Sequence, residues 1–225
     1  MMLPNMTREE LRRDFLADVP AAQTKLIYLK EDFGKLVKKT TRFPFSRWYP
    51  YTTKTGRGNR WLFCFIANKR SDWDNPLKLA FCLYNTMEGT GVVTAAVSGH
   101  PIFFTPHFFN RYIKRTGRTD FPAMDSIKEF LESHADIHVQ IRCADCDILK
   151  SSGRYGEKYR DFECVVYEGE GIAIIDTSDR LYSTYVTFIS DDLLHEDQAK
   201  TLAEVAERQK PLVEMSNRML KNRKH

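Results

Sequence analysis

The sequence predicts an α+β protein whose sheet is mainly antiparallel. Apolar residues recur first at helical spacing, then at the two-residue spacing of strands, and later in short helices followed by further strands. The links between neighbouring strands have the length of hairpin loops, and strands do not alternate with helices as in a parallel βαβ protein. The composition, with 42% hydrophobic and 28% charged residues, is that of a globular protein.

N-terminal helices and a loop are expected before the first strand. Residues 7–18 form one helix, because Thr7 is a good cap and Glu10 follows three positions later, as in a capping box. A second helix is expected at 21–39, where apolar residues recur every three or four positions. Residues 40–60 contain two prolines and two glycines and lack a helical period, which predicts a loop.

The rest of the chain is expected to form strands and three more helices. A central helix at 107–116 is capped by Thr105 and ends at Gly117, and a shorter helix covers 124–134. A long C-terminal helix is expected to begin at Ser190. The expected strands are 61–67, 77–84, 91–97, 102–105, 137–142, 162–167, 172–176 and 182–189.

This order of elements predicts two parts. Residues 1–60 form a helical region with a basic, aromatic loop, and residues 61–225 form an α+β domain. Five cysteines, an odd number, and no recognisable export signal favour a reducing, cytoplasmic location. No apolar run is long enough to span a membrane, so no membrane partner is expected.

Charge is distributed unevenly along the chain. Residues 1–123 hold 20 Lys and Arg against 10 Asp and Glu, whereas residues 124–225 hold 14 against 20. A chain of this kind often presents its basic part to RNA or another polyanion. The alternative is that the two parts of the chain simply attract each other.

The segment 40–60 is the first candidate nucleic-acid site. It interleaves basic and aromatic residues and contains no acidic residue. Cationic side chains can follow a phosphate backbone while aromatic rings stack on unpaired bases. The alternative is that the aromatic side chains pack the segment against the core. The candidate binding residues are Arg42, Arg47, Trp48, Lys54, Arg57 and Arg60.

The central helix is the second candidate site. His107, Arg111 and Arg115 follow one another at four-residue spacing and therefore form one polar stripe. Phe108 and Tyr112 form a neighbouring apolar stripe that can anchor the helix. Such a His-Arg-Arg helix combines a proton-transfer group with two guanidinium groups suited to phosphate. The alternative is an ordinary solvated helix face.

The order of elements around this helix resembles the RelE-like superfamily of small ribonuclease toxins. The resemblance covers about residues 100–200 and rests on Thr105, His107, Arg111, Arg115 and the strand at 187–190. It is nearest to the His-x-x-x-Arg-x-x-x-Arg branch of bacterial and phage proteins. It implies a toxin-like hydrolase that binds RNA, needs no cofactor and has a protein inhibitor or partner.

The resemblance also implies roles for individual residues. His107 would act as base or acid in metal-independent RNA cleavage, and Arg111 and Arg115 would hold the phosphate. The last strand would supply a hydroxyl from Tyr185 or Thr187, which share a face if the two-residue period is regular. The alternative is a non-catalytic protein that keeps the fold for partner binding or a structural role.

A zinc-stabilised module is the remaining alternative. His134, His138, Cys143 and Cys146 are zinc-ligand types, and each pair has suitable internal spacing. The two pairs are too close in sequence for a usual zinc finger, and a regular strand would point His138 and Cys143 in opposite directions. The sequence therefore predicts that no metal is bound.

Overall fold

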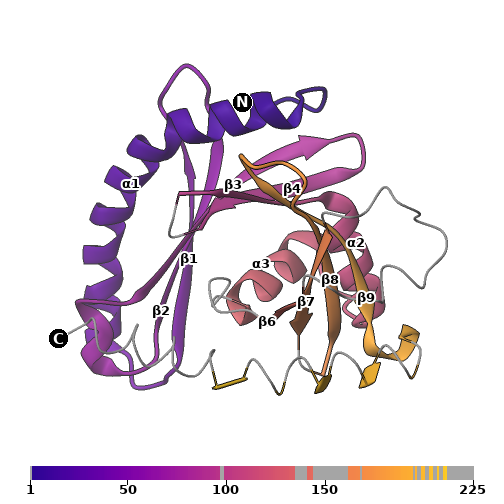
Figure 1. Cartoon of the computed structure of the whole chain (residues 1–225). Helices are drawn as coiled ribbons and strands as arrows, with labels where there is room; N and C mark the ends of the chain where they lie inside the picture. The colour runs from indigo at the N-terminus through magenta and orange to yellow at the C-terminus, as the bar shows by residue number, and fades with distance from the viewer. Residues whose placement is uncertain are drawn as a thin grey trace. The chain divides into compact units, whose positions relative to one another are not determined.

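The computed structural model describes residues 2–96, 99–134, 141–143, 162–167 and 169–194, together with eight residues between 196 and 211. The chain divides into two compact units, Met1–Thr94 and Ala95–His225, each of which is described by itself (Figure 1). The boundary expected at residue 60 falls inside the first unit. None of the helices within these described ranges has both the length and the hydrophobicity that crossing a membrane requires.

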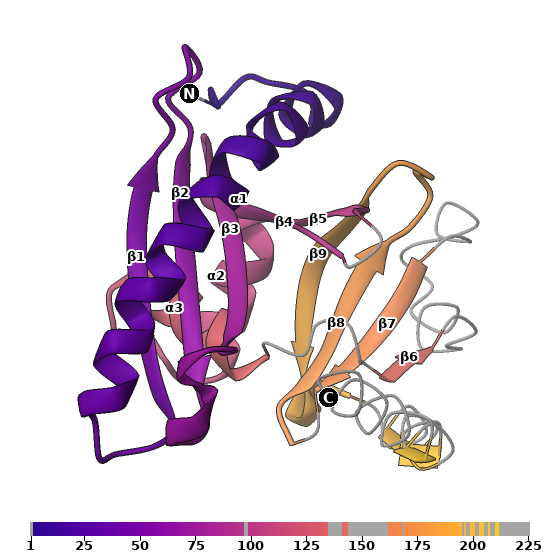
Figure 2. The same ribbon diagram turned by 90° about the vertical axis from the view of Figure 1, so that its left-hand side faces the viewer.

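The first unit is a long helix packed on an antiparallel sheet. The sheet order is β1-β2-β3-β4, and each strand pairs with the next in antiparallel register. Figure 2 shows the helix running across one face of this sheet. The elements are α1 (Arg8–Lys39), β1 (Phe45–Thr52), β2 (Arg60–Ala67), η1 (Arg70–Trp73), β3 (Leu77–Thr86) and β4 (Gly89–Ala95).

Helix α1 is one continuous helix of 32 residues, so the expectation of two N-terminal helices is wrong. It begins with the expected capping box of Thr7 and Glu10 and continues through Pro20. A proline inside a helix costs about 3 kcal/mol. The buried residues of α1 extend on both sides of Pro20, from Leu11 to Val37, and this burial offsets the cost.

The predicted loop at 40–60 is also wrong in part, because it contains strand β1. This strand pairs with β2 over its whole length, from Phe45 opposite Ala67 to Thr52 opposite Arg60. Pro50 is tolerated because β1 is the edge strand and needs hydrogen bonds on only one side. Aromatic packing against β2 and α1 thus overrides the turn signals of this segment.

The second unit combines two helices with five further strands. Its sheet order is β5-β9-β8-β7-β6, with β5 and β9 parallel and the other pairs antiparallel. With the first unit, this confirms an α+β protein with mostly antiparallel sheet. The elements are β5 (Pro101–Phe104), α2 (Pro106–Arg115), α3 (Ala123–Ser133), β6 (Ile141–Cys143), β7 (Phe162–Tyr167), β8 (Gly171–Asp176), β9 (Ser183–Ser190) and η3 (Asp191–Leu193).

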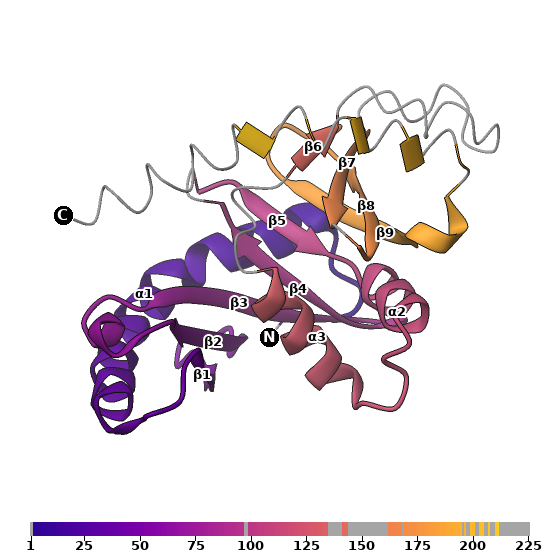
Figure 3. The same cartoon turned by 90° about the horizontal axis from the view of Figure 1, so that it is seen from below.

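Helix α2 lies against β9, as Figure 3 shows. The Thr105 side chain caps the helix by accepting a hydrogen bond from the backbone N–H of Phe108, and its hydroxyl also donates to the carbonyl of Tyr185 on β9 at 3.0 Å. The Phe108 ring packs against Tyr185 and against Phe130 of α3. Cap and aromatic core together fix which side of α2 faces solvent.

The long helix expected to begin at Ser190 does not begin there. Ser190 pairs with Gly171 in the sheet, and its side chain makes no capping bond. The short 3₁₀ turn η3 follows, and Leu194 is extended. The described residues beyond it that are helical are Glu196, Ala199, Lys200, Ala203, Glu204, Glu207, Lys210 and Pro211. The rest of the predicted helix lies outside the described residues.

Candidate functional site

Helix α2 presents part of the predicted His-Arg-Arg stripe to solvent. His107 and Arg111 are exposed, and so is Lys114. Arg115 is half-buried and donates from Nη1 to the carbonyl of Phe188 on β9, so it helps to attach the helix to the sheet. We call His107, Arg111 and Lys114 the α2 basic face. No Asp or Glu occurs in the sequence between residues 88 and 120, so this helix contributes no negative charge of its own.

The hydroxyl expected from the last strand is not placed as the regular period predicts. The Tyr185 side chain is fully buried, and its ring stacks on Phe104 with the centroids 4.2 Å apart. Strand β9 contains a bulge next to Tyr185, and both Tyr185 and Phe188 pack on Phe108 of α2. Tyr185 and Phe188 therefore share a face, and the half-buried Thr187 between them does not follow Tyr185.

The candidate binding residues of the first unit extend from just before β1, through β1 and the loop that follows it, to the first residue of β2. The Trp48 ring stacks on Phe81, at 6.0 Å between centroids, as the core-packing alternative predicted. Arg42 is exposed before β1, and the Arg47 guanidinium lies over the Tyr49 ring. The Arg57 Nε lies 3.4 Å from Asp14 Oδ1. The Arg60 Nη2 donates a hydrogen bond to Asn85 Oδ1 at 3.1 Å. Lys54 is exposed at the loop.

The alternative zinc ligands are only partly within the described residues. Among the described residues no three His, Cys, Asp or Glu side chains are grouped closely enough to hold a metal ion. Cys143 lies in β6, and His138 and Cys146 fall outside the described residues. Both ring nitrogens of His134 have neighbours in the protein, described below. That no metal is bound stays a prediction.

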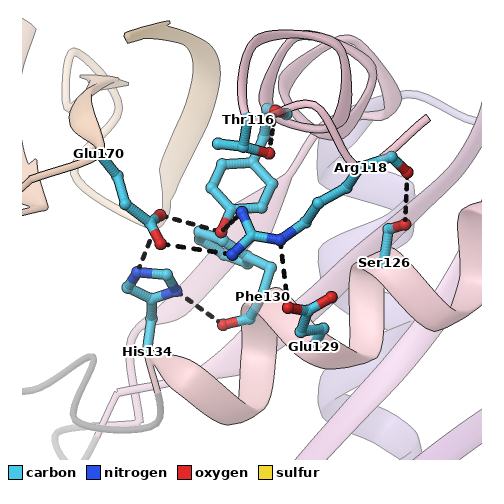
Figure 4. A network of polar contacts seen from close by, with 8 residues as sticks. Thr116, Arg118, Ser126, Glu129, Phe130, His134 and Glu170 are labelled. Atoms are coloured by element: carbon cyan, nitrogen blue, oxygen red, sulfur yellow. Dashed lines mark hydrogen bonds and ion pairs between the residues drawn. The ribbon is translucent and has the colours of Figure 1, made fainter. Parts of the chain in front are cut away.

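The structure brings together four ionisable side chains that no sequence pattern connects. Tyr112 of α2 donates from its hydroxyl to Glu170 Oε2 at 2.9 Å and accepts a hydrogen bond from Arg118 Nη1 at 2.7 Å. Arg118 Nη2 lies 3.5 Å from Glu170 Oε1, and His134 Nε2 lies 3.6 Å from Glu170 Oε2 (Figure 4). We call Tyr112, Arg118, His134 and Glu170 the polar cluster.

The members of the polar cluster come from α2, from the segments that follow α2 and α3, and from the β7–β8 hairpin. Arg118 follows Gly117, which ends α2 with φ 70°. Its Nε also donates to Glu129 Oε1 at 3.1 Å, and Figure 4 shows Arg118 reaching between Glu129 and Glu170. Glu170 sits in the tight β7–β8 hairpin, and His134 directly follows the last residue of α3. The cluster therefore joins both helices to the hairpin.

The hydrogen bond of His134 Nδ1 indicates the tautomer of its neutral ring. His134 Nδ1 lies 2.8 Å from the carbonyl oxygen of Phe130. A carbonyl oxygen can only accept, so Nδ1 carries the hydrogen of the neutral ring. Nε2 then has a lone pair and faces another acceptor, Glu170 Oε2. The neutral ring is thus a proton acceptor positioned beside a carboxylate.

Burial shifts the pKa values of two members of the cluster. Burial lowers the pKa of His134, and Arg118 adds to this, whereas the Phe130 carbonyl and Glu170 oppose it. Burial also raises the pKa of Tyr112, and the negative charge of Glu170 raises it further. Tyr112 therefore stays protonated and donates to Glu170, while His134 favours its neutral form near neutral pH.

Sequence reasoning missed the cluster as a unit. It considered His134 only as a metal ligand and did not single out Tyr112, Arg118 or Glu170 as functional residues. The tight hairpin around Glu170 and the helix stop before Arg118 are visible in the sequence, but the pairing of these places is tertiary. A comparison with protein-family models gave no match, and comparisons with curated proteins and with solved structures gave none either.

Proposed function

We propose that the second unit binds single-stranded RNA along the α2 basic face. The proposal is supported by the exposure of His107, Arg111 and Lys114 on a helix whose opposite side is buried. Lys and Arg side chains that neutralise phosphates release condensed counterions, which drives binding at low salt. The absence of Asp and Glu from residues 89–119 means that no acidic side chain of this stretch opposes it.

The position of Arg118 connects this face with the polar cluster. Helix α2 has 10 residues and is therefore about 15 Å long. Arg118 follows its C-terminal end by three residues, and its side chain is 21% exposed. An RNA strand that follows the α2 basic face beyond the end of the helix is thereby brought toward the guanidinium of Arg118, which can hold a phosphate.

We further propose that the polar cluster cleaves the bound RNA without a metal. His134 Nε2 takes the proton of a 2′-hydroxyl, and the 2′-oxygen attacks the adjacent phosphorus. The bond to the 5′-oxygen breaks and this oxygen takes a proton from water, while the imidazolium of His134 returns its proton to the resulting hydroxide, so that a 2′,3′-cyclic phosphate and a 5′-hydroxyl remain. Arg118 balances the charge that develops on phosphorus, and Glu170 stabilises the imidazolium.

One observation carries this assignment: the Nε2 of His134 lies beside Glu170, with Arg118 on the same carboxylate. It is the chemistry that the resemblance to RelE-like ribonucleases implies, with His134 rather than His107 as the base. The competing function is RNA binding without cleavage. It is favoured by the way in which the cluster ties α2, α3 and the hairpin together, a purely structural role.

The test compares binding and cleavage of a labelled single-stranded RNA at low salt with EDTA present. His134→Asn keeps an amide donor near the position of Nδ1 and removes the proton acceptor, so binding should persist and cleavage should fall by about 10²–10⁴-fold. Arg111→Gln should weaken binding and reduce its salt dependence. Arg180→Gln, at an exposed arginine that is close in sequence to Asp176 and Asp179, is the matched control and should change neither.

The outcomes separate the hypotheses. Cleavage lost in His107→Asn but kept in His134→Asn would return the base to α2. Wild-type protein that binds RNA and never cuts it would establish the non-catalytic alternative. Wild-type protein without salt-dependent affinity for RNA would refute binding and cleavage together.

A further inference from the structure

The loop between β1 and β2 is built around a buried carboxylate. This loop, residues 53–59 with the sequence TKTGRGN, projects beyond the end of the sheet beside α1 (Figure 2). Asp18 of α1 is fully buried and accepts three hydrogen bonds from it. The donors are Thr53 Oγ1 at 2.9 Å, Thr55 Oγ1 at 3.0 Å and Asn59 Nδ2 at 2.9 Å.

Closing a hairpin around a buried carboxylate costs free energy. Burying a carboxylate costs several kcal/mol unless its hydrogen bonds and charge are compensated. All three side chains that donate to Asp18 are neutral, and within the described residues no Lys, Arg or His forms an ion pair with it. Two strands in antiparallel register can be joined by a two-residue turn without any such support. The buried hydrogen bonds therefore serve to fix one conformation of the loop.

In that conformation the loop exposes cationic side chains and backbone that a ligand can approach. Lys54, Gly56 and Arg57 are exposed at the tip, while Thr53 and Asn59 are buried at the base. A Cβ added at Gly56 or Gly58 would meet no atom within 4 Å, so a ligand can approach the backbone there. In the part of the chain that the structure describes, no acceptor lies opposite the backbone N–H groups of Gly56 and Arg57.

The loop itself carries cationic side chains and no acidic residue. No Asp or Glu occurs in the sequence between residues 32 and 72. Arg57 has one acidic neighbour, with 3.4 Å between its Nε and Asp14 Oδ1, and its side chain remains 45% exposed. Exposed cations next to backbone N–H groups and glycines are the donor set that phosphate groups require.

We propose that this loop is a phosphate-binding site for the backbone of single-stranded RNA, and that Asp18 is its positioning residue. The inference rests on the proposed RNA binding and adds a second, separate contact region in the first unit. Lys54 and Arg57 contact phosphate oxygens, and the backbone N–H groups of the tip donate to them. Asp18 touches no ligand and acts by holding Thr53, Thr55 and Asn59.

The decisive variant is Asp18→Asn in the full chain. It removes a negative charge near the loop, so electrostatics alone would tighten RNA binding. The positioning role predicts the opposite, because an amide group cannot accept from all three donors and the loop loses its single conformation. We expect affinity for a labelled single-stranded RNA 12-mer to fall several-fold while Lys54 and Arg57 remain in place.

Two further variants and one control variant keep the test independent of folding. Lys54→Gln should weaken binding and lower the slope of log affinity against log salt by about one, as the loss of one phosphate contact does. Thr55→Val removes one bond to Asp18 without changing charge and should weaken binding less than Asp18→Asn. Lys78→Gln changes the charge of an exposed lysine on β3 by the same amount and should leave the affinity unchanged.

The results distinguish this inference from the function on which it rests. If Arg111→Gln weakens binding while Lys54→Gln and Asp18→Asn do not, RNA binding stands and the loop site is refuted. Tighter binding by Asp18→Asn would also refute the positioning role. Competition by adenosine monophosphate as effective as by the oligonucleotide would assign the phosphate to a free nucleotide and overturn the RNA assignment. Wild-type protein that does not bind RNA refutes both.

Discussion

Two glycines on either side of Glu170 allow a matched test of how the polar cluster is held. Gly169 has φ 76° and Gly171 has φ 141°, so both favour glycine. A Cβ on Gly169 would meet nothing within 4 Å. A Cβ on Gly171 would overlap the carbonyl oxygen of Ile189 and lie 2.7 Å from Ser190 Cα. The same substitution therefore differs in two ways that both disfavour it at Gly171: a collision with the backbone of β9, and a φ far outside the left-handed region.

The two expected costs follow from these differences. Gly169→Ala should lose only the cost of a left-handed alanine, about 1–2 kcal/mol in the free energy of unfolding. Gly171→Ala adds a collision that is relieved only by parting β8 and β9 at the pair Gly171 and Ser190. With the hydrogen bonds lost there, the total should reach about 3–5 kcal/mol. Glu170 would also move away from Arg118.

Urea unfolding followed by far-UV circular dichroism measures both costs. The three tryptophans, Trp48, Trp61 and Trp73, all lie in the first unit, so their fluorescence does not report directly on this hairpin. Equal losses for the two variants would refute the reasoning, because they would mean that the close approach of Gly171 to β9 carries no energetic consequence. A smaller loss for Gly171→Ala than for Gly169→Ala would refute it as well.

Two further predictions concern the polar cluster. Tyr112→Phe removes a buried hydroxyl that is hydrogen-bonded to Glu170 and to the guanidinium of Arg118, and should lower the free energy of unfolding by about 2 kcal/mol. The control Tyr28→Phe, at a residue that is 63% exposed, should change it by less than about 0.5 kcal/mol. Equal effects of the two variants in denaturation curves would contradict the network. Burial holds the pKa of His134 in the folded protein below its unfolded value of about 6.5, so the unfolded chain binds the proton more readily, and stability that is present above pH 6.5 is lost as the pH falls toward the folded pKa. The difference in the free energy of unfolding between wild type and His134→Asn, measured by urea unfolding at pH 7.5 and 5.5, should therefore shrink at the lower pH. A difference that stays constant would contradict this prediction.

Local sequence signals determined most of the secondary structure. The capping box at Thr7 and the Thr105 cap place helix starts correctly, because a cap is a contact between residues three apart. The hairpin links between the expected strands 77–84 and 91–97, and between 162–167 and 172–176, were predicted for the same reason, since a tight turn depends on a few neighbouring residues. The α+β class with mainly antiparallel sheet follows from these elements and their short links.

The errors in the fold occurred where distant residues override a local signal. Pro20 remains inside α1 because the helix buries one face on both sides of it. The segment around Trp48 becomes a strand because β2 offers it a partner over eight residues. Ser190 is a good cap in isolation, but its pairing with Gly171 assigns it to the sheet.

By itself, the sequence determined which residues could carry charge and chemistry, and only the tertiary structure decided which of them meet. The spacing of His107 and Arg111 placed both on one exposed helix face, because helical geometry is local. The period that would align Tyr185 with Thr187 fails at a bulge in β9. The contact between His134 and Glu170 joins the end of a helix to a hairpin 36 residues away. Such a contact depends on how whole elements pack, and packing is set by buried surfaces spread along the chain.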